Sequence, residues 1–203
     1  MVGKLLTIQY LQPFEVKLNY FMNFKFTTNQ FSGVFVIEPR CFLDERGYFY
    51  ETYKYSDFKN AGIQDNFIQD NHSFSIQGVV RGLHFQVSPR QQAKLVKCVV
   101  GEIYDCIVDL RKSSPTFGKY FGIKLSAENK LMLYVPAGFA HGFSTLSKTA
   151  EVFYKVSDEY DPKSEFGLRF DDQEIGIDWQ VSNPIVSEKD KILPLFKDLK
   201  TFF

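Results

Sequence analysis

Histidine and cysteine are scarce in this sequence, and neither sign of charge is in excess. Of its 203 residues, only three are histidine and three are cysteine. Basic and acidic residues number 24 each, so the formal net charge is zero. A balanced chain has no global field that would attract nucleic acid or an anionic membrane surface. We therefore expect neither as a partner.

The three cysteines, Cys41, Cys98 and Cys106, show no paired metal-binding or redox spacing. An odd number without such spacing argues against a disulfide framework and favours a reducing compartment, so we expect a cytoplasmic protein. Cys98 and Cys106 lie within apolar, strand-like runs, and we expect both to be buried as small hydrophobic residues.

Long hydrophobic runs are also missing. No apolar stretch approaches the roughly 18 residues needed to span a bilayer. Residues 1–21 contain scattered polar side chains and lack the apolar centre and small-residue cleavage site of a signal peptide. They are either an N-terminal tail or an over-long start upstream of a native first residue, Met22. We expect an N-terminal extension over residues 1–21, not necessarily native, and one domain over residues 22–203.

What the chain does contain is a series of short runs rich in Val, Ile, Phe, Tyr and Thr. They recur at close spacing between turn sequences such as Asp44-Glu45-Arg46-Gly47 and Pro136-Ala137-Gly138. This pattern predicts an all-β fold, an antiparallel sandwich or barrel. Only two short helices are expected: one capped by Ser56 and stopped by Gly62, the other opening at Ser187.

One of these runs, Val79-Val80-Arg81-Gly82-Leu83-His84-Phe85-Gln86, carries one of the three histidines close to an arginine. The fixed charge of Arg81 disfavours a protonated imidazole at His84, and a neutral imidazole accepts protons. His84 is therefore a general base, a metal ligand or a buried polar residue with a hydrogen-bond partner.

A second local feature is the sequence Pro-Ala-Gly-Phe-Ala-His at residues 136–141, a tight turn followed by His141. It resembles the second motif of the cupin superfamily, a jelly-roll β-barrel in which this histidine often helps to bind a metal. A cupin metal site also needs a His-x-His pair, whereas this chain has His84-Phe85-Gln86, with Lys94 downstream. An ammonium repels a dication and donates no lone pair. We predict a metal-free, cupin-type jelly-roll of antiparallel strands.

These residues suggest a particular chemistry. An imidazole with an ordinary pKa near 6.5 can take a proton at neutral pH, and a fixed ammonium such as Lys94 can hold negative charge that develops on oxygen. A base and an oxyanion partner are the minimum equipment for removing a proton α to a carbonyl. A tyrosine on the opposite face could return the proton and so invert the carbon. No Gly-rich dinucleotide fingerprint or Walker loop is present, and we expect no cofactor.

The combined pattern resembles the dTDP-4-dehydrorhamnose 3,5-epimerases of deoxysugar synthesis, from about Phe31 to Asp190. The motifs occur in order along the chain: Asp44 to Phe49 with Glu51, Gln69 to Ser73, Arg81 to Gln86, Lys94, Val108 to Arg111 with Ser113 to Gly118, Pro136 to Phe143, Tyr154-Lys155 and Ser187 to Asp190. Each motif is weak by itself, and it is their order and spacing that make the resemblance specific.

The resemblance implies a role for each matching residue. His84 matches the base that removes the C3 and C5 protons beside the C4 ketone, and Asp190 matches its carboxylate partner. Lys94 matches the group that stabilises the enolate, and Tyr154 matches the acid. Further positions match those that hold the sugar and the nucleotide diphosphate: Arg46, Glu51, Gln69, Asn71, Arg81, His141, Glu165 and Lys189. The resemblance also implies a homodimer that uses no cofactor and acts on dTDP-4-dehydro-6-deoxy-glucose.

Several alternatives stay open from the residues alone. Asp109 suits a partner for the base as well as Asp190 does, and Tyr160 is an alternative to Tyr154 or a residue that stacks on thymine. His72 is equally well explained as a hydrogen-bonding residue at a strand end. Besides the 3,5-epimerase, the chain fits a related sugar-nucleotide epimerase that acts at one carbon only, or a cupin that binds a sugar without catalysis.

Overall fold

The computed structural model describes residues 23–200 and residue 203. The N-terminal extension expected over residues 1–21 lies outside the described residues. Thirteen strands and three short helical segments occur in the described part. The all-β prediction is confirmed. No helix in this part of the chain is long and apolar enough to cross a membrane.

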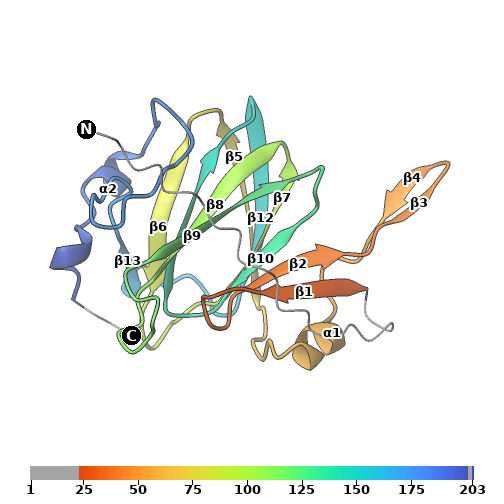
Figure 1. The fold of residues 1–203 in the computed structure, drawn as a ribbon, viewed down its shortest axis with the longest axis horizontal. Helices are drawn as coiled ribbons and strands as arrows, with labels where there is room; N and C mark the ends of the chain where they lie inside the picture. The colour runs from red at the N-terminus through yellow and green to blue at the C-terminus, as the bar shows by residue number, and fades with distance from the viewer. Residues whose placement is uncertain (1–22, 201–202) are drawn as a thin grey trace, which may run out of the picture.

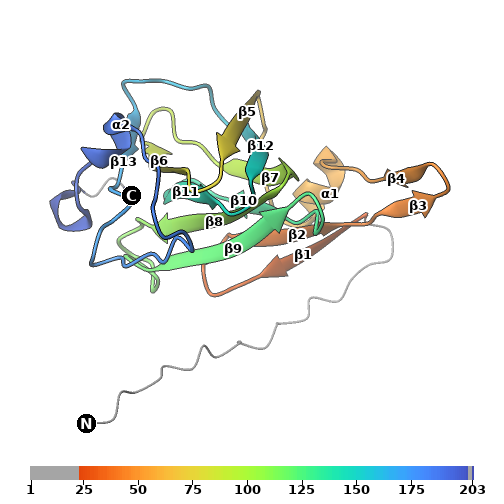
Figure 2. The same cartoon turned by 90° about the horizontal axis from the view of Figure 1, so that it is seen from above.

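Two antiparallel sheets face one another and enclose the interior (Figure 1, Figure 2). The first sheet has the strand order β1 (Phe24–Thr28), β2 (Phe35–Pro39), β10 (Met132–Val135), β7 (Lys94–Val100), β12 (Thr149–Val156) and β5 (Gln69–Ile76). The second sheet has the order β13 (Glu165–Gly167), β6 (Val80–Gln86), β11 (Phe139–Thr145), β8 (Glu102–Asp109) and β9 (Tyr120–Ser126). This arrangement agrees with the predicted jelly-roll.

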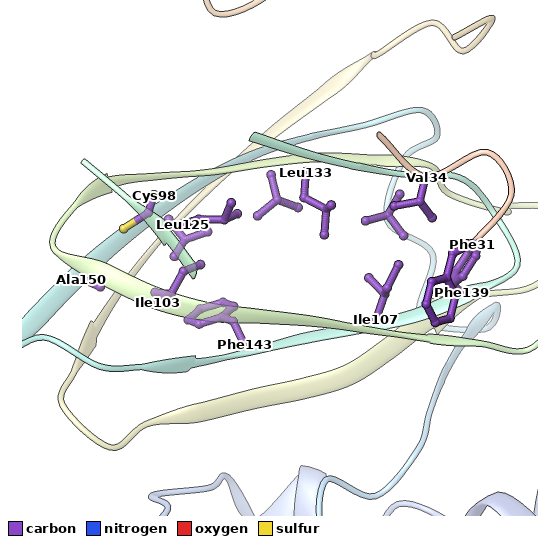
Figure 3. Close-up of a cluster of buried hydrophobic side chains, with 13 residues drawn as sticks. Phe31, Val34, Cys98, Ile103, Ile107, Leu125, Leu133, Phe139, Phe143 and Ala150 are labelled. Carbon is purple, nitrogen blue, oxygen red and sulfur yellow. The ribbon is translucent and has the colours of Figure 1, made fainter. Parts of the chain in front are cut away.

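Strand alternation divides the apolar residues among three clusters. On β7, for example, Val96 faces the space between the sheets while Leu95 faces outward. The inner cluster, shown in Figure 3, fills that space with residues such as Ile107, Leu133 and Phe143. The outer faces are covered separately, the first sheet by helix α1 (Tyr55–Asn60) and the second by the chain around Trp179. Because successive side chains point to opposite faces, strands such as β7 and β8 contribute to two clusters.

The prediction that Cys98 and Cys106 are buried is confirmed, and all three cysteines are free thiols. The two cysteines point to different faces of their sheets, since Cys98 lies in the inner cluster and Cys106 in the outer one. Both behave as small apolar residues, as their sequence surroundings indicate.

The two expected helices are present, with one correction. Helix α1 begins at Tyr55, so Ser56 lies inside it, and no side chain caps its first turn. Lys54 occupies the N-cap position in place of the expected serine. Its ammonium lies 3.3 Å from the Asp57 carboxylate. Helix α2 (Glu188–Lys191) begins directly after Ser187, as predicted, and the Ser187 side chain accepts a hydrogen bond from the Asp190 N–H.

A two-stranded hairpin, β3 (Phe42–Asp44) and β4 (Gly47–Phe49), extends away from the two main sheets (Figure 1). Its turn is the predicted Asp44-Glu45-Arg46-Gly47, in which the Arg46 N–H donates to the Asp44 carboxylate. Large apolar side chains on the hairpin are exposed, among them Leu43 and Phe49.

Candidate active site

Two adjoining cavities open between the sheets, with volumes of about 470 Å³ and 150 Å³. Both are lined by His84, Lys94 and Tyr154. His84 comes from the second sheet, whereas Lys94 and Tyr154 come from the first. The two cavities therefore form one site with walls from both sheets, and its base and acid candidates approach from opposite sides.

His84 is held against a carboxylate from the far end of the chain. Its Nε2 lies 2.7 Å from Asp190 Oδ1, although the two residues are 106 positions apart. Asp190 is only 4% exposed and also accepts from the Gly82 N–H at 3.3 Å. Burial raises the pKa of Asp190, but the hydrogen bond and charge of His84 outweigh it, so that the pKa lies below its usual value.

Gly82 lets β6 approach β11 closely enough to place His84 in the wall of the site. Its φ is +109°, and a Cβ there would lie 2.7 Å from both the Gly142 Cα and the His141 carbonyl oxygen. Any other residue would force the two strands apart. Glycine is thus required at position 82 for the close packing of the two strands, and its N–H also donates to Asp190.

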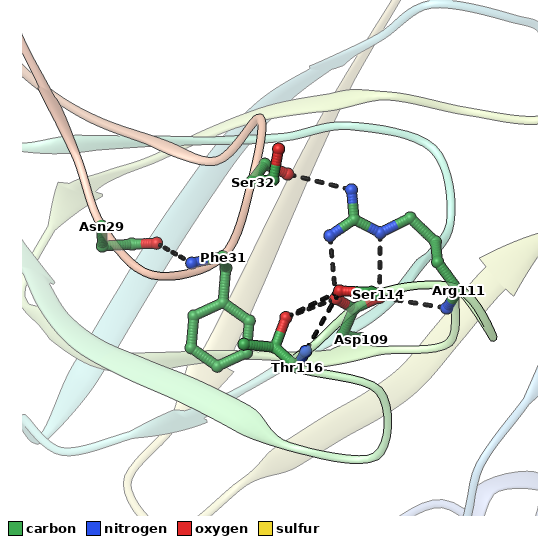
Figure 4. Close-up of polar contacts among 7 residues, drawn as sticks. All are labelled: Asn29, Phe31, Ser32, Asp109, Arg111, Ser114 and Thr116. Carbon is green, nitrogen blue, oxygen red and sulfur yellow. Dashed lines mark hydrogen bonds and ion pairs between the residues drawn. The ribbon is translucent and has the colours of Figure 1, made fainter.

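Asp109, the other partner considered for His84, is fully engaged elsewhere. Its carboxylate accepts hydrogen bonds from Arg111, Ser114 and Thr116 in the loop after β8 (Figure 4). The Arg111 guanidinium also donates to the Ser32 carbonyl at 2.9 Å. This network ties two loops together and leaves Asp190 as the carboxylate that meets His84.

Lys94 places an ammonium in the interior, where only 9% of the residue is exposed. Its Nζ donates to the His84 carbonyl oxygen at 3.3 Å. Burial lowers the pKa of Lys94 to about 8, against the opposing charges of Asp105 and Glu165. An ammonium with one protein acceptor keeps further N–H groups available for an oxygen of a ligand.

Tyr154 faces the same space from β12. Burial raises the pKa of its hydroxyl, while the positive charge of Arg81 opposes the shift. A tyrosine that holds its proton at neutral pH can donate that proton in a reaction. Tyr160 is the secondary candidate from the sequence, but its hydroxyl already donates to Glu165 Oε2 at 2.8 Å, and Tyr160 lines only the smaller cavity.

The remaining predicted residues lie around this centre. Arg81 and Lys189 line the larger cavity, and Gln69, Asn71 and Glu165 line the smaller one. Lys189 Nζ lies 2.6 Å from Glu165 Oε2, an oxygen that also accepts from Tyr160.

His141, on β11, lines the larger cavity and pairs with His84 across the strands. Its Nε2 lies 2.8 Å from Asp105 Oδ1. Asp105 has no role in the sequence-based prediction. Its signal is a carboxylate in the middle of the mostly apolar strand β8, at the same alternation as the inward-facing Ile103 and Ile107.

Three residues lie outside both cavities. Arg46 and Glu51 are on and beside the β3–β4 hairpin, where Arg46 pairs with Asp44 and Glu51 accepts from Asn23. His72 is on the outer side of β5 and its Nε2 lies 2.9 Å from Glu151 Oε2. Within residues 23–200, no three His, Cys, Asp or Glu side chains are grouped so as to hold a metal ion.

Comparison with known proteins gives the chain its family. The family model described as dTDP-4-dehydrorhamnose 3,5-epimerase matches residues 28–198. The chain belongs to this family. A dTDP-4-dehydrorhamnose 3,5-epimerase from Shigella flexneri is 52% identical over 158 residues, which are 77% of this chain and 87% of the relative.

Two solved structures of the epimerase family are informative. One is a dTDP-6-deoxy-D-glucose-3,5-epimerase from Legionella pneumophila in complex with dTDP-4-keto-L-rhamnose. It is 42% identical with a TM-score of 0.84, and the match covers 87% of this chain and 95% of that one. The other is a 3'-monoepimerase from Streptomyces bikiniensis in complex with dTDP-quinovose, 32% identical with a TM-score of 0.75, covering 80% of this chain and 83% of that one.

For this epimerase-family site, we expect the Lys94 ammonium to lose its proton with a midpoint near pH 8, because burial disfavours its charged form. NMR titration of ¹³C-labelled lysine side chains measures this midpoint, and the spectrum of Lys94→Gln identifies the signal. Exposed lysines such as Lys191 serve as internal controls. A Lys94 midpoint near the ordinary value of 10.5 would contradict the closed environment.

Proposed function

We propose that this protein is a dTDP-4-dehydrorhamnose 3,5-epimerase that converts dTDP-4-dehydro-6-deoxy-glucose to dTDP-4-dehydro-L-rhamnose. The observation that carries the proposal is the pairing of His84 with Asp190, across one cavity from Lys94 and Tyr154. Base, enolate stabiliser and acid are present together. The high identity to epimerases of this name supports the same reaction.

The reaction requires a proton to leave a carbon beside the C4 ketone. His84 Nε2 faces the Asp190 carboxylate, so it carries the ring proton and Nδ1 keeps a lone pair. Nδ1 takes the proton from carbon, and the C–H electron pair moves into the enolate. The Lys94 ammonium stabilises the charge on the C4 oxygen. The Asp190 carboxylate stabilises the imidazolium that results.

Inversion then requires a proton from the other side of the sugar ring. Tyr154 comes from the sheet opposite His84 and holds its proton at neutral pH, since burial raises its pKa. Its hydroxyl donates to the carbon face that the base did not use, and the electron pair of the enolate returns to form the new C–H bond. The His84 imidazolium then gives its proton to water and the Tyr154 phenolate takes one up. Both groups are thereby restored, and the same steps at the second carbon give the doubly inverted product.

The nucleotide part of the substrate is assigned to the rim. Arg81 and Lys189 line the larger cavity and carry the positive charge that a diphosphate requires. Tyr160 is 53% exposed beside the smaller cavity, and we assign its ring to stacking on thymine. Gln69, Asn71, His141 and Glu165 supply the polar contacts to the rest of the ligand.

A second candidate is epimerisation at one carbon only. The 32% identical Streptomyces protein is a 3'-monoepimerase, and its fold matches this chain over most of its length. The same base can serve one carbon or two, because the difference lies in how the ring is presented and reprotonated. Identity above 50% to 3,5-epimerases favours reaction at both carbons.

We also propose that the protein is a homodimer in which Arg46 acts across the interface. Arg46 is on a hairpin that extends away from the sheets of its own chain, so its guanidinium does not line its own cavity (Figure 1). The exposed Leu43 and Phe49 on that hairpin are the apolar surface that a second subunit would cover. Three free cysteines are compatible with the proposed cytoplasmic location.

Hydrogen exchange at carbon tests the function. We expect incubation with dTDP-4-keto-6-deoxyglucose in D₂O to place deuterium at both C3 and C5, as seen by NMR. Label at one carbon supports the monoepimerase. His84→Ala should abolish exchange at both carbons, whereas His72→Ala, an exposed histidine outside the cavities, should keep it. No label with wild-type protein and authentic substrate would exclude both candidates.

Replacing the acid should separate exchange from inversion. We expect Tyr154→Phe to lower epimerisation by about 10²-fold or more, with a smaller effect on deuterium exchange, because the base is intact. Tyr120→Phe on β9, outside both cavities, is the matched control. Equal loss of exchange and turnover in Tyr154→Phe would show that Tyr154 is not the acid.

Mixed dimers test the placement of Arg46. Arg46→Ala and His84→Ala are each expected to be inactive or weak alone. After unfolding and refolding together, one site of each mixed dimer would contain both native residues. Activity should then return to roughly a quarter of the wild-type value at equal mixing, as expected for a two-fold interface. No recovery would place Arg46 outside the partner's site.

A further inference from the structure

A second histidine–carboxylate pair lies beside the first. His141 Nε2 and Asp105 Oδ1 are 2.8 Å apart on the adjacent strands β11 and β8. The His141 side chain is 8% exposed and that of Asp105 is fully buried. His141 lines the larger cavity whereas Asp105 does not, so the carboxylate supports the site from behind.

The Asp105 carboxylate is poorly satisfied for its depth. Among the described residues, its Oδ2 has no hydrogen-bond partner. Asp109, equally buried four residues later on the same strand, accepts from one arginine and two hydroxyl groups. A buried carboxylate is costly unless hydrogen bonds or an opposite charge compensate it. Compensation for Asp105 must therefore come from a charge at longer range.

Lys94 presents the complementary problem. Its ammonium is buried, and within residues 23–200 no carboxylate lies inside the 4 Å of a direct ion pair. The two negative charges that favour its protonated form are Asp105 and Glu165. Glu165 already pairs with Lys189 at 2.6 Å. Asp105 is the remaining countercharge, and its one contact among the described residues is the His141 ring.

We propose that Asp105 is a positioning residue of the active site, whose charge keeps Lys94 protonated while its Oδ1 fixes the His141 ring. The proposal rests on the proposed function, in which an ammonium must meet the enolate oxygen. Asp105 contacts no substrate in this scheme and acts through its two neighbours.

Other charged groups also bear on the titration of Lys94, and they come from every wall of the site. Those that line the two cavities with it, apart from Asp105 behind His141, are Arg81 and His84 on β6, His141 on β11, Tyr154 on β12, Tyr160 and Glu165 around β13, and Lys189 and Asp190 at α2. Only a variant that changes one charge and no shape can isolate Asp105.

Asp105→Asn meets this condition, because the amide oxygen can still accept from His141 Nε2 while the charge is lost. We expect the midpoint of Lys94, followed by lysine NMR in the protein without substrate, to fall by about 1 pH unit. The alkaline limit of turnover should fall by the same amount, since only the protonated ammonium stabilises the enolate. Below this limit, turnover should be largely retained.

Two matched variants separate charge from structure. Asp109→Asn removes a buried charge from the same strand, and the Lys94 midpoint should not move, because Arg111 neutralises that carboxylate. His141→Gln keeps the Asp105 charge, so the midpoint should stay near pH 8 while KM rises. If Asp105→Asn does not fold, His141→Gln still tests the claim. A fall of the Lys94 midpoint in His141→Gln would show that the His141 ring, and not the Asp105 charge, keeps Lys94 protonated.

An unchanged Lys94 midpoint in folded Asp105→Asn would overturn the proposal, whatever happens to turnover. The NMR titration uses no substrate, so its result stands apart from the proposed function. Wild-type protein that fails to exchange or epimerise the dTDP sugar would refute that function and leave the electrostatic link between Asp105 and Lys94 to be decided by the titration.

Discussion

The hydrogen bond between His84 and Asp190 is the contact on which the site depends. It joins strand β6 to helix α2, and much of the chain between them serves to bring the two residues together. Backbone hydrogen bonds anchor the chain that leads to α2 onto β6: Leu168 and Leu83 exchange N–H donors, and the Val80 N–H donates to the Ile185 carbonyl oxygen. Ser187 then caps α2 and fixes the backbone at Asp190 itself. Without these anchors, the imidazole would lose its tautomer and its orientation.

A second constraint is that the apolar core and the charged site share one interior. Inward positions of β8 and β11 carry apolar and charged residues side by side: Asp105 lies opposite Phe143, and Ile107 lies opposite His141. Charges inside a closed sheet pair have to be balanced within it, since water is largely excluded. The interior therefore holds a carboxylate behind the cavity wall, Asp105, as well as an ammonium that lines the cavity, Lys94.

Much of this arrangement could be predicted from the sequence. Apolar alternation marked most of the strands, because a half-buried strand needs it. No such signal marks β5, whose inward positions Gln69, Asn71, Ser73 and Ser75 are polar where they approach the site. The prediction of a Ser56 cap is wrong because helix α1 begins at Tyr55, so that Lys54 holds the N-cap position and Ser56 lies inside the first turn.

The site residues divide along similar lines. Local motifs are enough to predict His84, Lys94 and Tyr154 as site residues. The choice of Asp190 over Asp109 depends on a contact between residues 106 positions apart, which no local motif contains. The folded structure shows that Asp109 forms an ion pair with Arg111 and not with His84. Asp105 could not be predicted from the sequence, because an acidic residue between apolar neighbours forms no motif and its contact, His141, lies on another strand.

The ion pair between Lys189 and Glu165 has one further consequence. An anionic ligand that draws Lys189 away leaves the Glu165 carboxylate with Tyr160 alone, and its negative charge then acts more strongly on Lys94. Ligand binding at the rim and proton affinity in the interior would then be thermodynamically linked, each favouring the other. In the proposed reaction, the nucleotide would strengthen the hold of Lys94 on its proton when the chemistry requires it.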